Sequence, residues 1–157
     1  MPARPMRYPL VHELSPEECW ARLRTSVVGR LAIPGAERLE LFPVNFVVDD
    51  RTVVFRTDPG TKLTASNQEA AVAFEADGFE PATNEAWSVV LNGILEPAVG
   101  ASEVGEFLER PLFPWQYGEK AFVVRVIPAL VSGRQFVVTD PARWASHLAG
   151  LRRAAAE

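Results

Sequence analysis

The chain has 157 residues and a mass of 17.3 kDa, which suits one ordinary domain and leaves no room for two independent cores. Hydrophobic residues make up 48% of the sequence and charged residues 23%, so a disordered or fibrous chain is excluded. The net charge is −4 and the isoelectric point is about 5.3, so the basic surface typical of nucleic-acid-binding proteins is not expected.

Cysteine use and apolar patterning favour a cytoplasmic protein. Cys19 is the single cysteine, which excludes an intramolecular disulfide. No run approaches the ~18 apolar residues of a membrane span, and residues 1–10 have no apolar centre of a signal peptide. We therefore expect no membrane partner. His12 and His147 lie near opposite ends of the chain, so we also expect no metal site.

The first half of the chain begins with a helix signal. Ser15, Pro16 and Glu18 form a capping box with a proline at the first helical position, which predicts a helix over about 16–26. The hydrophobic period then changes to two, which is typical of strands. The elements expected next are strands at 27–33, 39–48 and 52–58, and a short helix at 61–67 capped by Thr61.

The second half continues mainly as strands. Six or seven strands in mostly hairpin order, with short helices between them, predict a mainly β (α+β) fold, a small antiparallel barrel with peripheral helices. The expected elements are strands at 71–77, 87–97, 121–127 and 130–138 with a bend at Pro128, a polar loop at 77–85, a helix from Ser102, an aromatic loop at 111–118 and a terminal helix over about 141–154.

The segment 55–63 is the first candidate binding site. A strand ends at Arg56 and Thr57, a Pro-Gly turn reverses the chain, and a helix begins with Thr61 and Lys62. Helix N-termini favour phosphate, a guanidinium can grip two phosphate oxygens, and an ammonium adds a point charge. The alternative is a capped turn with solvated charges, because the lone glycine forms neither a Walker A loop nor a dinucleotide fingerprint.

Polar residues on the strand that begins near Trp87 form a second candidate. Ser88 and Asn92 share one strand face with Val90, where they either line a ligand or meet solvent. Trp87 and Trp115 could cover a flat ring system, but such side chains more often belong to a core or an interface.

Two further positions are ambiguous. Gly133, beside Arg134, permits close approach of either a ligand or a second backbone. Asn45 follows Pro43, which marks an edge strand or a bulge because proline cannot donate to a ladder. Cys19 is expected to be buried and inert, and no residue stands out as a catalytic acid or base.

Seven short segments together resemble the pyridoxamine 5'-phosphate oxidase-like superfamily of split β-barrel flavoproteins, and within it the branch related to nitroimidazole-resistance proteins. No segment is specific alone, but they occur in the family's order. The resemblance implies one FMN-binding split β-barrel domain over 1–157, with a core at about 15–138. The segments are Gly29-Arg30-Leu31-Ala32, Pro43-Val44-Asn45-Phe46, Val54-Phe55-Arg56-Thr57 with Gly60-Thr61-Lys62-Leu63, Val72-Ala73-Phe74-Glu75, Trp87-Ser88-Val89-Val90 with Gly93, Pro114-Trp115, and Ser132-Gly133-Arg134.

In that family a homodimer binds two FMN molecules at the subunit interface. The apolar segments 113–117 and 122–127 independently predict a homodimer, because large apolar patches mark partner surfaces. By resemblance, Val44 and Asn45 line the flavin, Arg56, Thr57, Thr61 and Lys62 hold its phosphate, Trp87 and Ser88 flank its ring edge, and Trp115 and Arg134 reach across from the partner chain.

The sequence departs from true pyridoxamine phosphate oxidases at Arg134, where the Arg-x-His substrate motif is absent. Oxidation of vitamin B6 phosphates is therefore not expected. We expect an FMN-binding oxidoreductase that acts on another small molecule. The alternatives are a reductase that uses an 8-hydroxy-5-deazaflavin coenzyme, and a flavin-binding or sensor protein without turnover.

Overall fold

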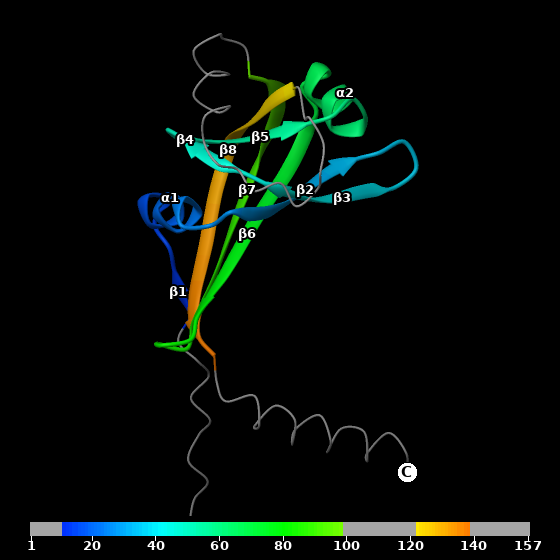
Figure 1. Ribbon diagram of the computed structural model, residues 1–157. Helices are drawn as coiled ribbons and strands as arrows, with labels where there is room; N and C mark the ends of the chain where they lie inside the picture. Colours follow the sequence, from blue (N-terminus) through cyan, green and yellow to red (C-terminus); the bar gives the residue numbers. More distant parts are fainter. Residues whose placement is uncertain (1–10, 99–121, 139–157) are drawn as a thin grey trace, which may run out of the picture.

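The computed structural model describes residues 11–98 and 122–138, which form a single curled antiparallel sheet with two short helices (Figure 1). Seven strands follow one path in the order β3-β2-β6-β7-β8-β5-β4, and β1 pairs with β8 beside that path. The mainly β fold is therefore confirmed. The elements are β1 (His12–Glu13), α1 (Pro16–Arg24), β2 (Val28–Pro34), β3 (Leu39–Asn45), β4 (Val47–Asp49), β5 (Thr52–Thr57), α2 (Thr61–Asn67), β6 (Ala71–Glu80), β7 (Glu85–Pro97) and β8 (Phe122–Val137).

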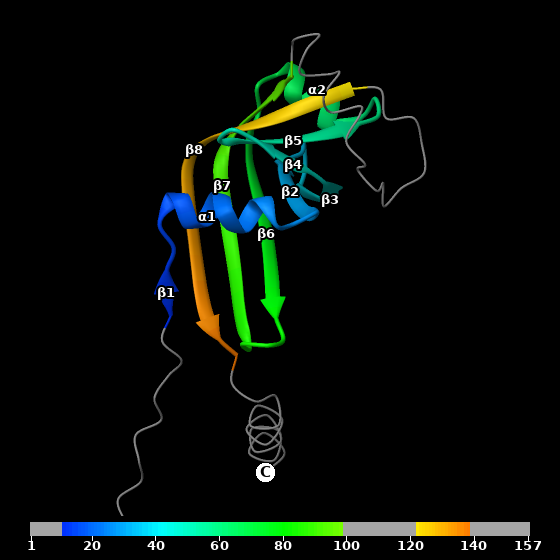
Figure 2. The same cartoon turned by 60° about the vertical axis from the view of Figure 1, so that its left-hand side comes forward.

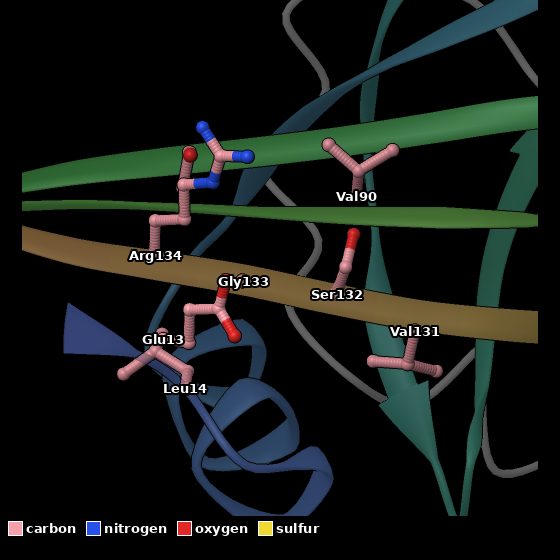
Figure 3. Close-up of a pocket in the computed structure, with 8 residues that line it drawn as sticks. Glu13, Leu14, Val90, Val131, Ser132, Gly133 and Arg134 are labelled. Atoms are coloured by element: carbon pink, nitrogen blue, oxygen red, sulfur yellow. The ribbon is translucent and has the colours of Figure 1, made fainter. Parts of the chain in front are cut away.

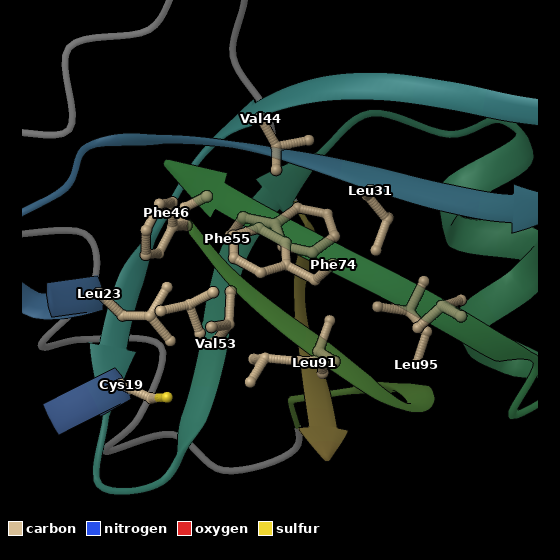
Figure 4. Packing of buried hydrophobic residues seen from close by; sticks show 14 of the residues in the cluster. Cys19, Leu23, Leu31, Val44, Phe46, Val53, Phe55, Phe74, Leu91 and Leu95 are labelled. Atoms are coloured by element: carbon tan, nitrogen blue, oxygen red, sulfur yellow. The ribbon is translucent and has the colours of Figure 1, made fainter. Parts of the chain in front are cut away.

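The sheet curls into a half-barrel around a main hydrophobic core, and Val54 and Val123 form a second, small buried cluster. The long strands β6, β7 and β8 lie side by side along the longest dimension of the sheet. The shorter strands fold over at one end of it (Figures 1 and 2). Side chains from β2, β3, β5, β6, β7 and β8 fill the inside of this curve. The rings of Phe46 and Phe74 meet edge to face, with their centres 4.9 Å apart (Figure 4). The core side chains that are at most 1% exposed include Leu31, Phe46, Phe55, Phe74 and Leu91.

Helix α1 begins as the sequence predicts. The backbone N–H of Ser15 donates to Glu18 Oε2 at 2.7 Å, and the Glu18 N–H donates to Ser15 Oγ at 3.3 Å. The helix ends at Arg24, slightly before the expected boundary. Its buried face carries Cys19 and Leu23, both without measurable exposure, so the expected burial of Cys19 is confirmed.

Helix α2 has the expected bounds but not the expected cap. Its N-cap is Gly60, and no side chain makes a capping hydrogen bond, so the assignment of Thr61 as the cap is wrong. Gly60 has a φ of 154°, a backbone conformation that glycine adopts without steric cost. The turn before α2 therefore depends on the backbone conformation of Gly60, whereas the sequence predicted a capping hydrogen bond to the Thr61 hydroxyl.

The expected strand 39–48 is divided at Phe46. The ring of Phe46 points into the core, and its N–H donates to the carbonyl of Val27 at 3.0 Å. β3 pairs with β2, whereas β4 pairs with β5, so the chain changes its partner strand at Phe46. Pro43 lies in β3, at one end of the sheet path, which confirms the edge position that proline indicated.

Strand β8 is continuous where two strands were expected. The bend at Pro128 survives as a register shift opposite Gly93, after which Leu130 pairs with Asn92. A Cβ on Gly93 would lie 1.9 Å from the carbonyl oxygen of Ile127, so only glycine fits at this irregularity. Strand β6 runs on to Glu80 and pairs with β7, which shortens the expected polar loop.

Several expectations fall outside the described residues, namely the helix from Ser102, the aromatic loop at 111–118 and the terminal helix at about 141–154. Within the apolar segment 122–127, Phe122 is 42% exposed, whereas Val123, Val124 and Val126 are buried. The expectation that this whole segment presents apolar surface is therefore wrong. Val124 and Val126 enter the main core, and Val123 packs with Val54 in a small buried cluster on the opposite face.

Candidate functional site

Arg56 and Thr57 end β5 and face opposite sides of the sheet. Arg56 pairs with Val123 of β8 and lies on the face away from the core, which we call the outer face. Thr57 is 1% exposed, and its hydroxyl donates to the carbonyl of Asp58 at 3.0 Å. The Arg56 side chain is half-buried, with its Nε shielded from solvent, and the Thr57 hydroxyl is engaged within the chain.

Thr61 and Lys62 open α2, three residues after β5 ends. Thr61 is exposed, whereas Lys62 is half-buried, with its Nζ 4.3 Å from the centre of the Phe42 ring. Because α2 has only seven residues, the side-chain charges and not a helix dipole must carry any anion binding here. We call this region, with Arg56, Thr61 and Lys62, the β5–α2 corner. A guanidinium, an ammonium and a hydroxyl together suit a phosphate group.

A hollow with a volume of about 460 Å³ lies where β1, β7 and β8 meet. Ser88 and Arg134 are direct cross-strand partners in it, so the structure brings these two predicted residues together. Val90 and Ser132 form the next cross-strand pair, and Figure 3 shows their side chains on the same side as Arg134. The lining residues are Glu13, Leu14, Ser88, Val90, Val131, Ser132, Gly133 and Arg134.

Ser132 and Glu13 were not selected from the sequence as site residues. Ser132 could have been found, because strand alternation puts it on the face of Arg134. Glu13 could not, since its place beside Arg134 depends on the pairing of β1 with the far end of the chain.

Two neighbouring pairs of predicted residues are split by strand alternation. Trp87 is 8% exposed and lies on the inner face, while Ser88 lies on the outer face. A Cβ on Gly78 would come within 2.4 Å of Trp87 Nε1, so the indole packs against the backbone of β6. Val44 is likewise 6% exposed in the core, and Asn45 is half-buried opposite Val28.

Gly133 accommodates a second segment of this chain. The N–H of Leu14 donates to the Gly133 carbonyl at 2.9 Å, and a Cβ at 133 would lie 2.7 Å from Cys19 Sγ. The alternative of a close second backbone therefore explains this glycine. Asn92 is exposed on the outer face, opposite Leu130. Of the two alternatives for this residue, the structure therefore shows the one in which it meets solvent.

The two groups of candidate residues lie toward opposite ends of β8. Arg56 pairs with Val123 and Ser88 pairs with Arg134, which are 134 − 123 = 11 residues apart on that strand. At ~3.3 Å per residue this is roughly 36 Å of strand. One chain therefore does not bring Arg134 to the β5–α2 corner. Trp115 lies outside the described residues.

Two groups near these regions have shifted pKa values. The hydrogen bond from Arg30 to Glu75, at 3.0 Å, raises the pKa of the Arg30 guanidinium, and Asp77 at 3.4 Å adds to the effect. Burial raises the pKa of the Cys19 thiol, which fits an inert side chain at neutral pH. The Arg30 ion pairs lie on the exposed outer face, where such pairs contribute little to stability.

Within residues 11–98 and 122–138, no three His, Cys, Asp or Glu side chains gather closely enough to hold a metal ion. In the same part of the chain, no helix is both long and apolar enough to cross a bilayer.

The fold is a curled antiparallel half-barrel in which Arg56 and Lys62 lie on either side of a three-residue link. The chain belongs to the pyridoxamine 5'-phosphate oxidase-like family, which is a family of flavin-binding proteins. The protein-family model described as pyridoxamine 5'-phosphate oxidase matches residues 15–135 of the sequence. The expected family is therefore confirmed.

Relatives in mycobacteria support this membership. A solved structure described as the FAD binding protein from Mycobacterium smegmatis is 35% identical, covers 79% of this chain and 97% of its own, and has a TM-score of 0.65. An uncharacterized protein of Mycobacterium tuberculosis is 30% identical over 132 residues, which are 81% of this chain and 86% of the relative. A Bacteroides thetaiotaomicron protein described in connection with 5-nitroimidazole antibiotic resistance is 13% identical, covers 82% of this chain and 91% of its own, and has a TM-score of 0.61, which shows a shared fold alone.

Proposed function

We propose that the chain is a flavin-dependent oxidoreductase that binds FMN, with the phosphate at the β5–α2 corner. The observation that carries this proposal is the pair of cations, Arg56 and Lys62, on either side of a three-residue link in a chain of a flavin-binding family. A guanidinium fork and an ammonium are the donors that a phosphate monoester prefers, so the residues present fit the group. Thr61 adds an exposed hydroxyl.

The isoalloxazine ring is assigned to the outer face beside Asn45 of one chain. Ser88, which pairs with Arg134 far along β8 from Arg56, would meet this ring from a second chain. Val44 and Trp87, which point inward, support these two residues by packing behind them. Arg134 lies too far along β8 to reach a flavin at Arg56 of its own chain, so it would serve the flavin of a second subunit, as would Trp115.

A homodimer is the assembly that this arrangement requires. The outer face exposes large apolar side chains from three strands, Leu41 at 65%, Leu130 at 58% and Ile94 at 38%. Leu41 and Leu130 stand at the ends of one cross-strand row through Ala32, Ala73 and Asn92. Apolar side chains grouped on one sheet face favour a partner surface.

Bound flavin would supply the electron chemistry, and the protein would anchor, orient and cover it. Gln135 occupies the position after Arg134, where it accepts a hydrogen bond from Arg22 and donates to Glu85 at 3.1 Å. Phe136 stands where the Arg-x-His motif has its histidine, so we propose a small-molecule substrate other than a vitamin B6 phosphate. A single cysteine suits the reducing cytoplasm, which is the location we propose.

FAD is the second candidate for the cofactor. The Mycobacterium smegmatis relative is described as FAD binding. Among the described residues, nothing lies within 4 Å of a Cβ placed on Gly60, so these residues leave the turn before α2 open.

The test compares Lys62→Ala with Arg51→Ala in fluorescence titrations with FMN and riboflavin. Loss of a charge-assisted hydrogen bond costs about 1.5–3 kcal/mol, so Lys62→Ala should bind FMN roughly ten- to a hundredfold more weakly and riboflavin equally well. Arg51 is a matched control, because it is an exposed cation at the other end of β5 whose ion pair with Glu17 is itself exposed. Equal FMN affinities in the two variants would remove the phosphate from the β5–α2 corner.

A further inference from the structure

We infer that Phe42 is a positioning residue for the phosphate-binding lysine, a role that rests on the proposed function of the β5–α2 corner. Phe42 lies in β3 and Lys62 lies in α2, so the contact joins two elements through residues that are 62 − 42 = 20 positions apart in the sequence. The Lys62 Nζ stands 4.3 Å from the centre of the Phe42 ring. This distance is well within the ~6 Å over which an aromatic face attracts a cation.

The ring is itself held in place. Phe42 is half-buried and packs against the main hydrophobic core, on the same strand face as Val44. A lysine side chain has a flexible four-carbon stem, and ordering that stem is a cost of every contact its ammonium makes. A fixed ring below the ammonium restricts the stem before a ligand arrives, and such preorganisation raises affinity without a new contact.

The ring does not compete with the phosphate for the ammonium. A cation rests on an aromatic face by one side, and the ammonium has three N–H donors that can point elsewhere. A charge-assisted hydrogen bond to an anion is also stronger than a cation–π contact at a partly exposed site. Phe42 therefore sets where the charge stands, and a phosphate takes the donors.

The experiment is a double-mutant cycle of Phe42→Leu and Lys62→Ala, read by titration with FMN and with riboflavin. Leucine keeps an apolar side chain but removes the aromatic face. Phe42→Leu should weaken FMN binding roughly two- to fivefold and leave riboflavin binding unchanged. In the Lys62→Ala background the same substitution should have no effect, because the charge that the ring positions is absent.

Two further variants separate positioning from packing. Phe42→Tyr keeps the ring and should retain the wild-type affinity for FMN. Phe79→Leu removes a ring of β6 that is 54% exposed, and it should change neither affinity. Urea unfolding of each variant shows that the proteins compared are folded.

The inference fails if Phe42→Leu weakens FMN and riboflavin equally, if it changes neither, or if its effect persists without Lys62. If Lys62→Ala itself leaves FMN binding unchanged, the phosphate assignment fails first and the role of Phe42 fails with it.

Discussion

Gly133 is a position at which the long strand β8 packs closely against Cys19 of α1. A Cβ at this position would lie 2.7 Å from Cys19 Sγ and 3.1 Å from Leu14 Cδ1, and both of these side chains are buried. Real side chains do not approach so closely, so either the helix or the strand would have to shift. The packing of the core therefore requires glycine, which has no Cβ, at position 133.

Gly133→Ala should therefore destabilise the protein, by about 1–3 kcal/mol as is usual for overpacking. Cys19→Ala removes the nearest clashing atom, so the glycine substitution should cost less in that background. Urea unfolding of the wild type, both single variants and the double variant measures the difference. An equal cost in the two backgrounds would show that Cys19 is not what excludes the methyl group.

Much of the candidate site could be predicted at the residue scale, because Arg56 and Lys62 lie on either side of one turn. The inward direction of the Thr57 side chain could also be predicted from the sequence, since Thr57 shares a strand face with the core residues Val53 and Phe55. The contact with Phe42 could not be predicted, because it depends on how β3 folds over the start of α2.

Elements were predictable where the signal was local. The capping box at Ser15 and Glu18 places the start of α1 correctly, because both partners lie within one turn. The division between β3 and β4 was missed, since it depends on a change of partner strand from β2 to β5. The continuity of β8 was missed for a similar reason: β7 pairs with it on both sides of Pro128.

The capping box also makes a prediction about pH. The hydrogen bond from the Ser15 backbone N–H lowers the pKa of the Glu18 carboxyl. A carboxyl with a lowered pKa stabilises the fold above its unfolded-state pKa, and this contribution is lost as the pH falls through the folded-state value. The stability advantage of the wild type over Glu18→Gln should therefore shrink on acidification.

Urea unfolding from neutral to acid pH measures this difference. Glu17→Gln is the control, because Glu17 lies in the same turn and outside the capping box. A Glu18→Gln difference that stays constant across the pH range would contradict the assigned role of the carboxylate.

At the scale of the whole molecule, the curled sheet separates a filled inner face from an outer face that exposes large apolar side chains. Sequence alternation predicts both faces, but it does not predict how the ends of β8 lie relative to the shorter strands. That arrangement puts Arg56 and Arg134 far apart in one chain. It is the physical reason for proposing that two chains complete each flavin site.

Native mass spectrometry of the wild-type protein, incubated with an equimolar mixture of FMN, FAD and riboflavin, tests the central claim most directly. The spectrum reports chain number, flavin number and flavin identity together. The account predicts an assembly of twice the 17.3 kDa chain mass that carries two phosphate-bearing flavins and no riboflavin. A 17.3 kDa species without flavin, or a complex that takes up riboflavin as readily as FMN, would contradict it.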